Sequence, residues 1–155
     1  MPCAKCITKP GYHNFVKFAK VGDADLFYTA PAKTEDFNED GTKLASIKLH
    51  VKEEASSGPW IWVMDCADMQ LKHYTEFSFN LGLLSLLNED PLLKEVWIVR
   101  PNIWIRTTIG FLQTFSSAAI LRSIKWFDGS NLEIHADLAT TGLADSKIHW
   151  LISQI

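Results

Sequence analysis

The feature that most constrains the fold is a run of five apolar residues, Trp60-Ile61-Trp62-Val63-Met64, between Gly58-Pro59 and Asp65. Successive side chains of a β-strand point to opposite faces of the sheet, so a strand that is apolar at every position needs apolar neighbours on both faces. The run is short and follows glycine and proline, which favours a strand over a helix. It therefore predicts a buried central strand.

Two other segments are also short apolar runs. The runs at 96–99 and 124–127 are also predicted to be strands, because they are short, apolar and bounded by turn residues. A hairpin is predicted for 17–21 and 26–29, which flank a Gly/Asp turn at 22–25.

Helices are predicted where apolar residues recur at intervals of three and four. The predicted helices are at 36–54, 77–87 and 103–116, with two weaker ones at 132–138 and 148–155. Strands alternating with helices predict an α/β fold with a mixed, mostly parallel central sheet covered by helices. We expect a single domain over 1–155, with its core at about 15–137 and with residues 1–13 flexible.

Composition excludes several classes of protein. Apolar residues make up 47% of the 155 residues, aromatic residues 12%, and the net charge is −3, which is unlike a disordered chain. The acidic balance predicts no nucleic-acid partner. Three cysteines without a signal-peptide core or a membrane-spanning run favour a reducing compartment, and we expect a cytoplasmic protein.

Charge is distributed unevenly along the chain. Residues 91–127 carry a net charge of +4, so the remainder carries −7. The basic residues of that segment are Lys94, Arg100, Arg106, Arg122 and Lys125. They could form a basic surface on an acidic protein, or they could be ordinary solvated charges.

The order of these segments resembles the CRAL-TRIO lipid-binding domain, the family of phosphatidylinositol, retinaldehyde and tocopherol transfer proteins. The resemblance rests on the strand at 60–65 ending in aspartate, on Asp90-Pro91 with the next strand, on Pro101-Asn102-Ile103-Trp104, and on 122–127. It covers about Phe15 to Asp137. A STAS-type domain shares the strand that ends in aspartate, but it fits the segments after Pro101 less well.

The resemblance implies an elongated apolar pocket that binds a lipid or another small hydrophobic molecule without catalysis. Lipid transfer and docking to a membrane surface are related roles in that family. The helix at 103–116 matches a mobile gate over the pocket in the transfer proteins, although it could also simply fill a core. The implied pocket residues are Met64, Leu81, Leu84, Trp104, Thr108, Phe111 and Phe115.

The implied headgroup site departs from the family. Gln70 and Lys72 stand where the family has a Ser-x-Ser/Thr pair, so specificity for phosphatidylinositol is not carried over. Ser123 aligns with a family lysine, and Lys125 would point the same way in a strand. With Arg106, these residues are the expected contacts of an anionic headgroup, or else surface cations. We also expect the chain to lack the family's N-terminal helical extension, because it resembles the short form found beside macro domains, in neurofibromin and in BCH scaffold domains.

That short form suggests an alternative function, a protein-interaction scaffold with a closed core. Such a scaffold predicts a partner patch of exposed aromatic residues, for which Trp60 and Trp150 are the candidates.

Catalytic and metal motifs give weaker signals. Cys3-x-x-Cys6 has the spacing of half a zinc site, but no second pair follows. Cys66 resembles a small buried hydrophobic residue more than a nucleophile, and Asp65 is expected to hydrogen-bond the end of its strand. The spacing of His135-x-Asp137 is too common to be informative. We therefore expect no enzymatic activity, no cofactor and no metal.

Overall fold

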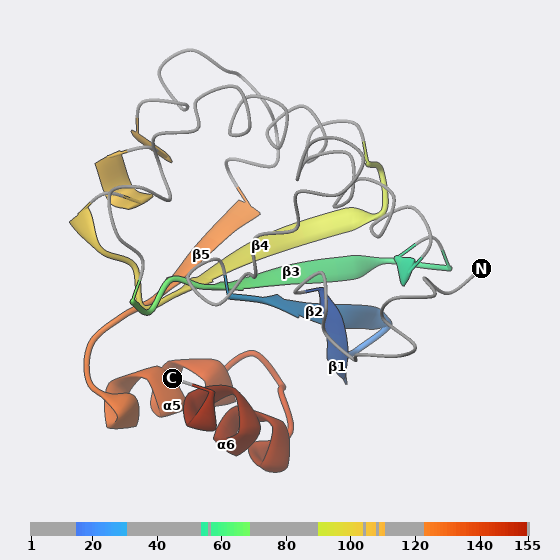
Figure 1. Cartoon of the computed structure of the whole chain (residues 1–155). Coiled ribbons are helices and arrows are strands. Elements are labelled where there is room, and N and C mark those ends of the chain that lie inside the picture. The colour runs from blue at the N-terminus through green and yellow to red at the C-terminus, as the bar shows by residue number, and fades with distance from the viewer. Residues whose placement is uncertain are drawn as a thin grey trace, which may run out of the picture.

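The structure is a computed structural model of the chain. It describes residues 15–30, 54–55, 57–68, 90–103, 105–107, 109–110 and 123–154. These residues form a five-stranded mixed sheet, and two helices lie below it in Figure 1. The predicted α/β class is confirmed.

The strands lie side by side in chain order. β1 pairs with β2 in antiparallel orientation, and the pairs from β2 to β5 are all parallel. Their bounds are β1 Val16–Val21, β2 Ala24–Thr29, β3 Trp60–Asp65, β4 Leu93–Val99 and β5 Ile124–Phe127. Each predicted strand is present, and β4 begins three residues earlier than predicted.

The predicted hairpin turns more tightly than expected. Val21 pairs with Ala24, so the loop is Gly22 and Asp23 alone. The φ of Gly22 is +58°, in the left-handed region that glycine enters without a steric penalty. A glycine at the first position of a two-residue loop matches the right-handed twist of the two strands.

β3 is the central strand that its sequence predicts. All six of its residues are buried, and it lies between β2 and β4. Trp60 and Trp62 pack on one face of the sheet, and Ile61 and Val63 pack on the other.

Two helices, α5 (Asn131–Ala139) and α6 (Asp145–Ser153), cover the lower face of the sheet in Figure 1. α5 begins with a capping box. The Ser130 side chain accepts a hydrogen bond from the Glu133 N–H at 3.2 Å, and the Glu133 carboxylate accepts one from the Ser130 N–H at 2.8 Å. The buried residues of the two helices are Ile134, Leu138, Ile148 and Leu151.

The sheet separates two apolar cores. The lower core joins the sheet to α5 and α6 and includes Leu26, Tyr28, Val63, Trp97 and Phe127. The upper core lies on the other face and includes Phe15, Phe27, Trp60, Trp62, Met64 and Ile98. Both faces of the sheet are therefore covered, as a strand that is apolar at every position requires.

Several predicted segments lie outside the described residues. These are residues 1–13, the helix at 77–87 and the helix at 36–54 except Glu54, which is helical. The helix at 103–116 is described only at 103, 105–107 and 109–110, all of which are helical. In the part of the chain that the structure describes, no helix is long and apolar enough to cross a membrane.

Candidate ligand-binding site

Four aromatic rings form the floor of the upper core. Phe15 stacks on Phe27, with the ring centroids 4.6 Å apart and the planes 6° from parallel. The Phe15 ring is also edge-on to Trp60 and Trp62, each with a centroid distance of 5.7 Å. These are the arrangements that aromatic quadrupoles favour, so the rings form a preorganised apolar surface. We call these four residues the aromatic floor.

The two indole N–H groups of the aromatic floor have polar partners. Trp60 Nε1 donates to Asp90 Oδ2 at 3.1 Å, and Trp62 Nε1 donates to Thr29 Oγ1 at 2.8 Å. Buried indole N–H groups are costly to leave without an acceptor. Both indole N–H groups are therefore satisfied within the protein, and the two rings are buried in the upper core.

The helical residues that follow β4 pack against the upper core. Ile105 and Ile109 both join it, and residues four apart lie on the same side of a helix. The Asn102 side chain accepts a hydrogen bond from the Ile105 N–H at 3.1 Å, which caps the start of the helix. Ile103 is 71% exposed, so the apolar character of this segment extends to its outer side.

One of the predicted pocket residues lies in the described part of the chain. Met64 is buried in the upper core, near the carboxyl end of β3. The others lie outside the described residues, namely Leu81, Leu84, Trp104, Thr108, Phe111 and Phe115. The pocket therefore stays a prediction, and Met64 belongs to the same core cluster as the aromatic floor.

Arg106, a predicted headgroup residue, already has two partners. Its guanidinium carbon lies 4.9 Å from the centroid of the Trp126 ring, and its Nη2 lies 3.0 Å from Asp128 Oδ2. The pKa of the Asp128 carboxyl is lowered, mainly by the hydrogen bond from the Gly129 backbone N–H and then by the one from Arg106. An anionic ligand would have to compete with Asp128 for this arginine.

The structure does not bring Lys125 together with Arg106. Trp126, which contacts Arg106, belongs to the upper core, whereas Lys125 is the adjacent residue of β5 and points to the lower face. Lys125 Nζ lies 3.0 Å from Glu95 Oε1. Ser123 is half-buried just before β5. Gln70 and Lys72 lie outside the described residues.

Polar side chains meet at the carboxyl ends of β2 and β3. The Tyr28 hydroxyl donates to Asp65 Oδ2 at 2.7 Å, and the Ala67 N–H donates to Asp65 Oδ1 at 3.0 Å. The expected role of Asp65 at the strand end is confirmed. Burial, with the nearby Asp65 as a second cause, raises the pKa of the Cys66 thiol to about 12. Burial and the hydrogen bond to Asp65 also raise the pKa of Tyr28.

Arg100 was named as part of a possible basic surface but was not among the residues predicted to bind a ligand. It follows β4, its φ is +52°, and its backbone N–H donates to the Phe127 carbonyl at 2.8 Å. Its guanidinium donates to the Asn131 side chain, while its buried Nε has no hydrogen-bond partner among the described residues. Its position at the carboxyl end of a parallel strand, where ligands of α/β sheets commonly bind, was the available signal.

The prediction that Trp60 belongs to an exposed aromatic patch is wrong. The Trp60 side chain is 1% exposed, because it is part of the aromatic floor. Trp150 is half-buried, and its ring stacks on Phe18 with a centroid distance of 4.9 Å. Neither residue forms a free aromatic surface.

Comparison with known proteins does not identify a family. No family model matches the sequence, and no curated protein matches it.

Proposed function

We propose that this protein is a non-enzymatic binding module for a lipid or another small hydrophobic molecule, with a CRAL-TRIO-like arrangement. The ligand binds against the upper core, beneath the helix that begins at residue 103. The observation that carries this proposal is the aromatic floor, whose indole N–H groups are both satisfied internally. Burial of an acyl chain contributes about 0.8 kcal/mol per methylene, so such a surface binds lipid without any catalytic group.

The polar groups at the strand ends suit binding better than nucleophilic catalysis. The pKa of Cys66 is raised to about 12 and that of Tyr28 is also raised, so both groups are protonated at neutral pH. A thiol acts as a nucleophile in its thiolate form, which a raised pKa disfavours. This pattern supports a protein that holds its ligand unchanged.

A membrane surface is the proposed source of the ligand. Ile103 and Arg106 are three residues apart and both exposed, so an apolar and a cationic side chain lie on the outer side of the helix. That pairing suits transient docking to an anionic bilayer. Arg106 would exchange Asp128 for a lipid phosphate during docking. The proposal places the module in the cytoplasm and gives it no nucleic-acid partner.

Native mass spectrometry, combined with organic extraction, tests the proposal. Protein purified under mild conditions is expected to carry a bound lipid or to take up a fluorescent phospholipid from vesicles. Trp104→Ala is expected to weaken uptake, because this position is predicted to line the pocket. Trp150→Ala is the matched control, since Trp150 lies on α6 across the sheet and should leave uptake unchanged. Absence of both bound lipid and uptake would overturn the proposal.

A protein-interaction scaffold is the second candidate. It is favoured by two exposed apolar side chains, Ile103 at 71% and Leu132 at 79%. The same preparations discriminate between the two functions. A scaffold would be free of lipid and would self-associate in sedimentation experiments, and the double variant Ile103→Ser/Leu132→Ser would remain monomeric.

A further inference from the structure

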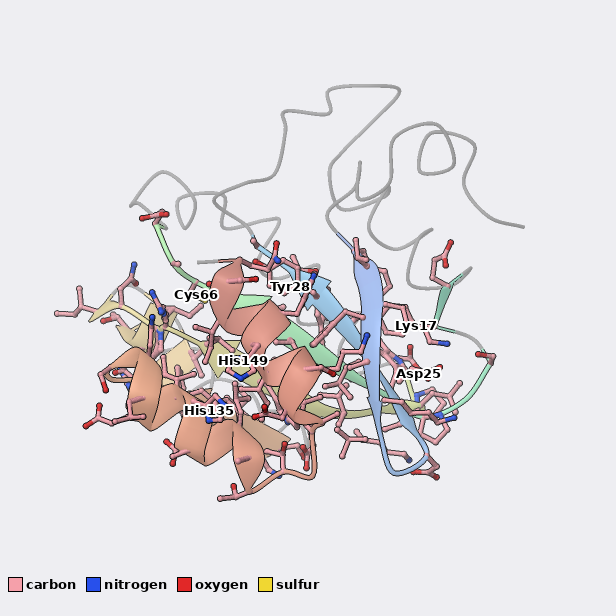
Figure 2. All side chains as sticks on the ribbon, turned by 90° about the horizontal axis from the view of Figure 1, so that it is seen from below. Lys17, Asp25, Tyr28, Cys66, His135 and His149 are labelled. Atoms are coloured by element: carbon pink, nitrogen blue, oxygen red, sulfur yellow. The ribbon has the colours of Figure 1, made fainter. Side chains whose placement is uncertain are left out.

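Three side chains that commonly bind metal ions meet on the surface of the α5–α6 pair. His135 Nε2 lies 3.1 Å from Asp145 Oδ1, and His149 Nε2 lies 3.2 Å from Asp145 Oδ2. One ligand atom from each of the three residues lies within 4.8 Å of the others. Figure 2 shows His135 and His149 beside each other. Their ring centroids are 5.2 Å apart.

The packing of the two helices holds these residues together. Asp145 and His149 are four residues apart on α6 and therefore share one side of it. His135 follows Ile134 of α5, whose side chain is fully buried in the lower core. His149 follows Ile148 of α6, which is buried in the same core. The three residues of the cluster therefore lie on two helices that pack against the sheet. Helices position the residues of a site more precisely than loops do.

We propose that His135, Asp145 and His149 bind a divalent transition-metal ion, for which zinc is the best match. Zinc binds imidazole nitrogen at about 2.0–2.1 Å and carboxylate oxygen at about 2.0–2.2 Å, so the edge of its tetrahedron is about 3.3–3.4 Å. His135 Nε2 lies close to that edge length from Asp145 Oδ1, and His149 Nε2 lies close to it from Asp145 Oδ2, so coordination through one oxygen requires a rotation of the Asp145 carboxylate. Two imidazoles disfavour Mg²⁺ and Ca²⁺, which prefer all-oxygen sites. Water completes the coordination.

Local charge also favours a cation at this position. Between Asn131 and Ser153 the acidic residues are Glu133, Asp137 and Asp145, and the only basic one is Lys147. Because one ligand comes from α5 and two from α6, the bound ion ties the two helices together. Binding to the folded state alone then stabilises the protein by mass action.

The test is a zinc titration of the full chain without an affinity tag, followed by competition with a chromogenic chelator. We expect one ion per chain at this cluster. His135→Gln, His149→Gln and Asp145→Asn should each weaken binding at least about tenfold, since loss of even an outer-shell partner costs 10–100-fold. Asp137→Asn is the matched control, because it removes the same charge from an exposed position of α5 that lies outside the cluster.

Two further measurements keep the outcome unambiguous. The Cys3→Ser/Cys6→Ser variant should retain the site, which separates it from the Cys-x-x-Cys pair. In the unsubstituted protein, zinc should shift the imidazole NMR signals of His135 and His149. The proposal is overturned if zinc leaves these signals unchanged, or if binding is lost in the cysteine variant and retained in the histidine variants.

Discussion

Asp65 ends β3 with both carboxyl oxygens hydrogen-bonded inside the protein. One oxygen accepts from the Tyr28 hydroxyl and the other from the Ala67 N–H. Tyr28 reaches it because β2 and β3 are parallel neighbours, with Tyr28 opposite Val63 in the register. The same carboxyl group adds to the effect of burial on Cys66. The free energy of unfolding should therefore depend on pH through this thiol.

We expect the protein to lose stability in alkali through Cys66. The pKa of its thiol is raised from 9.0 to about 12, so the folded protein keeps a proton that the unfolded chain releases above pH 9. Stability from this group is complete below pH 9 and falls as the pH rises towards 12. From this residue alone, the free energy of unfolding should be roughly 1 kcal/mol lower at pH 10 than at pH 8. Urea unfolding at the two pH values measures it.

The Cys66→Ala variant provides the control. Alanine does not titrate, so this share of the alkaline loss should vanish, although the variant is less stable at every pH because of the smaller side chain. An equal loss between pH 8 and pH 10 in both proteins would contradict the assignment.

Residues differ in how far sequence alone could place them. The opposite orientation of Trp62 and Val63 was predictable because a period of two is a local property of a strand. The meeting of His135 with Asp145 and His149 was not, since it depends on how two helices pack across a turn. The only local signal there was the spacing of four between Asp145 and His149, which is common on exposed helix surfaces.

For α5, too, some properties could be predicted from the sequence and others could not. Its existence was predicted over 132–138, and the structure extends it to Asn131–Ala139. Its start has a sequence signature, Ser130 followed three residues later by Glu133, that forms a capping box. The spacing of four places Ile134 and Leu138 on one side of the helix, but it did not indicate that both would be completely buried against the sheet. That burial comes from tertiary packing, which often outweighs intrinsic helix propensity.

Ser130→Ala is expected to destabilise the protein by about 1 kcal/mol, because it removes the acceptor for the Glu133 N–H. Ser130→Asp should retain most of the stability, since aspartate is an equally good cap and its charge suits the helix N-terminus. Chemical denaturation of the two variants measures the difference. Ser146→Ala, on the exposed surface of α6, is the control for loss of a hydroxyl. Equal stability of Ser130→Ala and Ser130→Asp would count against the cap.

At the scale of the whole molecule, the sheet order was the part that local patterns could not predict. Apolar runs identified the strands, and their alternation with helical segments favoured parallel pairing. The order β1-β2-β3-β4-β5 and the cover of the lower face by the last two helices depend on long-range contacts. The two C-terminal helices had the weaker helical patterns in the sequence. In Figure 1 they are nevertheless the only labelled elements that lie below the sheet.

Removal of α5 and α6 should therefore abolish folding. The two helices bury four aliphatic side chains in the lower core, and full burial of such side chains contributes roughly 1.5–3 kcal/mol each. Their loss, roughly 6–12 kcal/mol, is comparable to the entire stability of a typical domain, about 5–15 kcal/mol. It would also expose Tyr28, Val63 and Trp97 to water.

A chain that ends at Asp128 tests this, with a chain that ends at Gln154 as the control. The shorter chain is expected to aggregate or to show no cooperative unfolding transition by circular dichroism, and the control should unfold as the full chain does. A monomeric 1–128 chain with cooperative unfolding would show that the upper core is stable alone. The upper core would then be the independent folding unit, and α5 and α6, with their histidines, would be an addition to it.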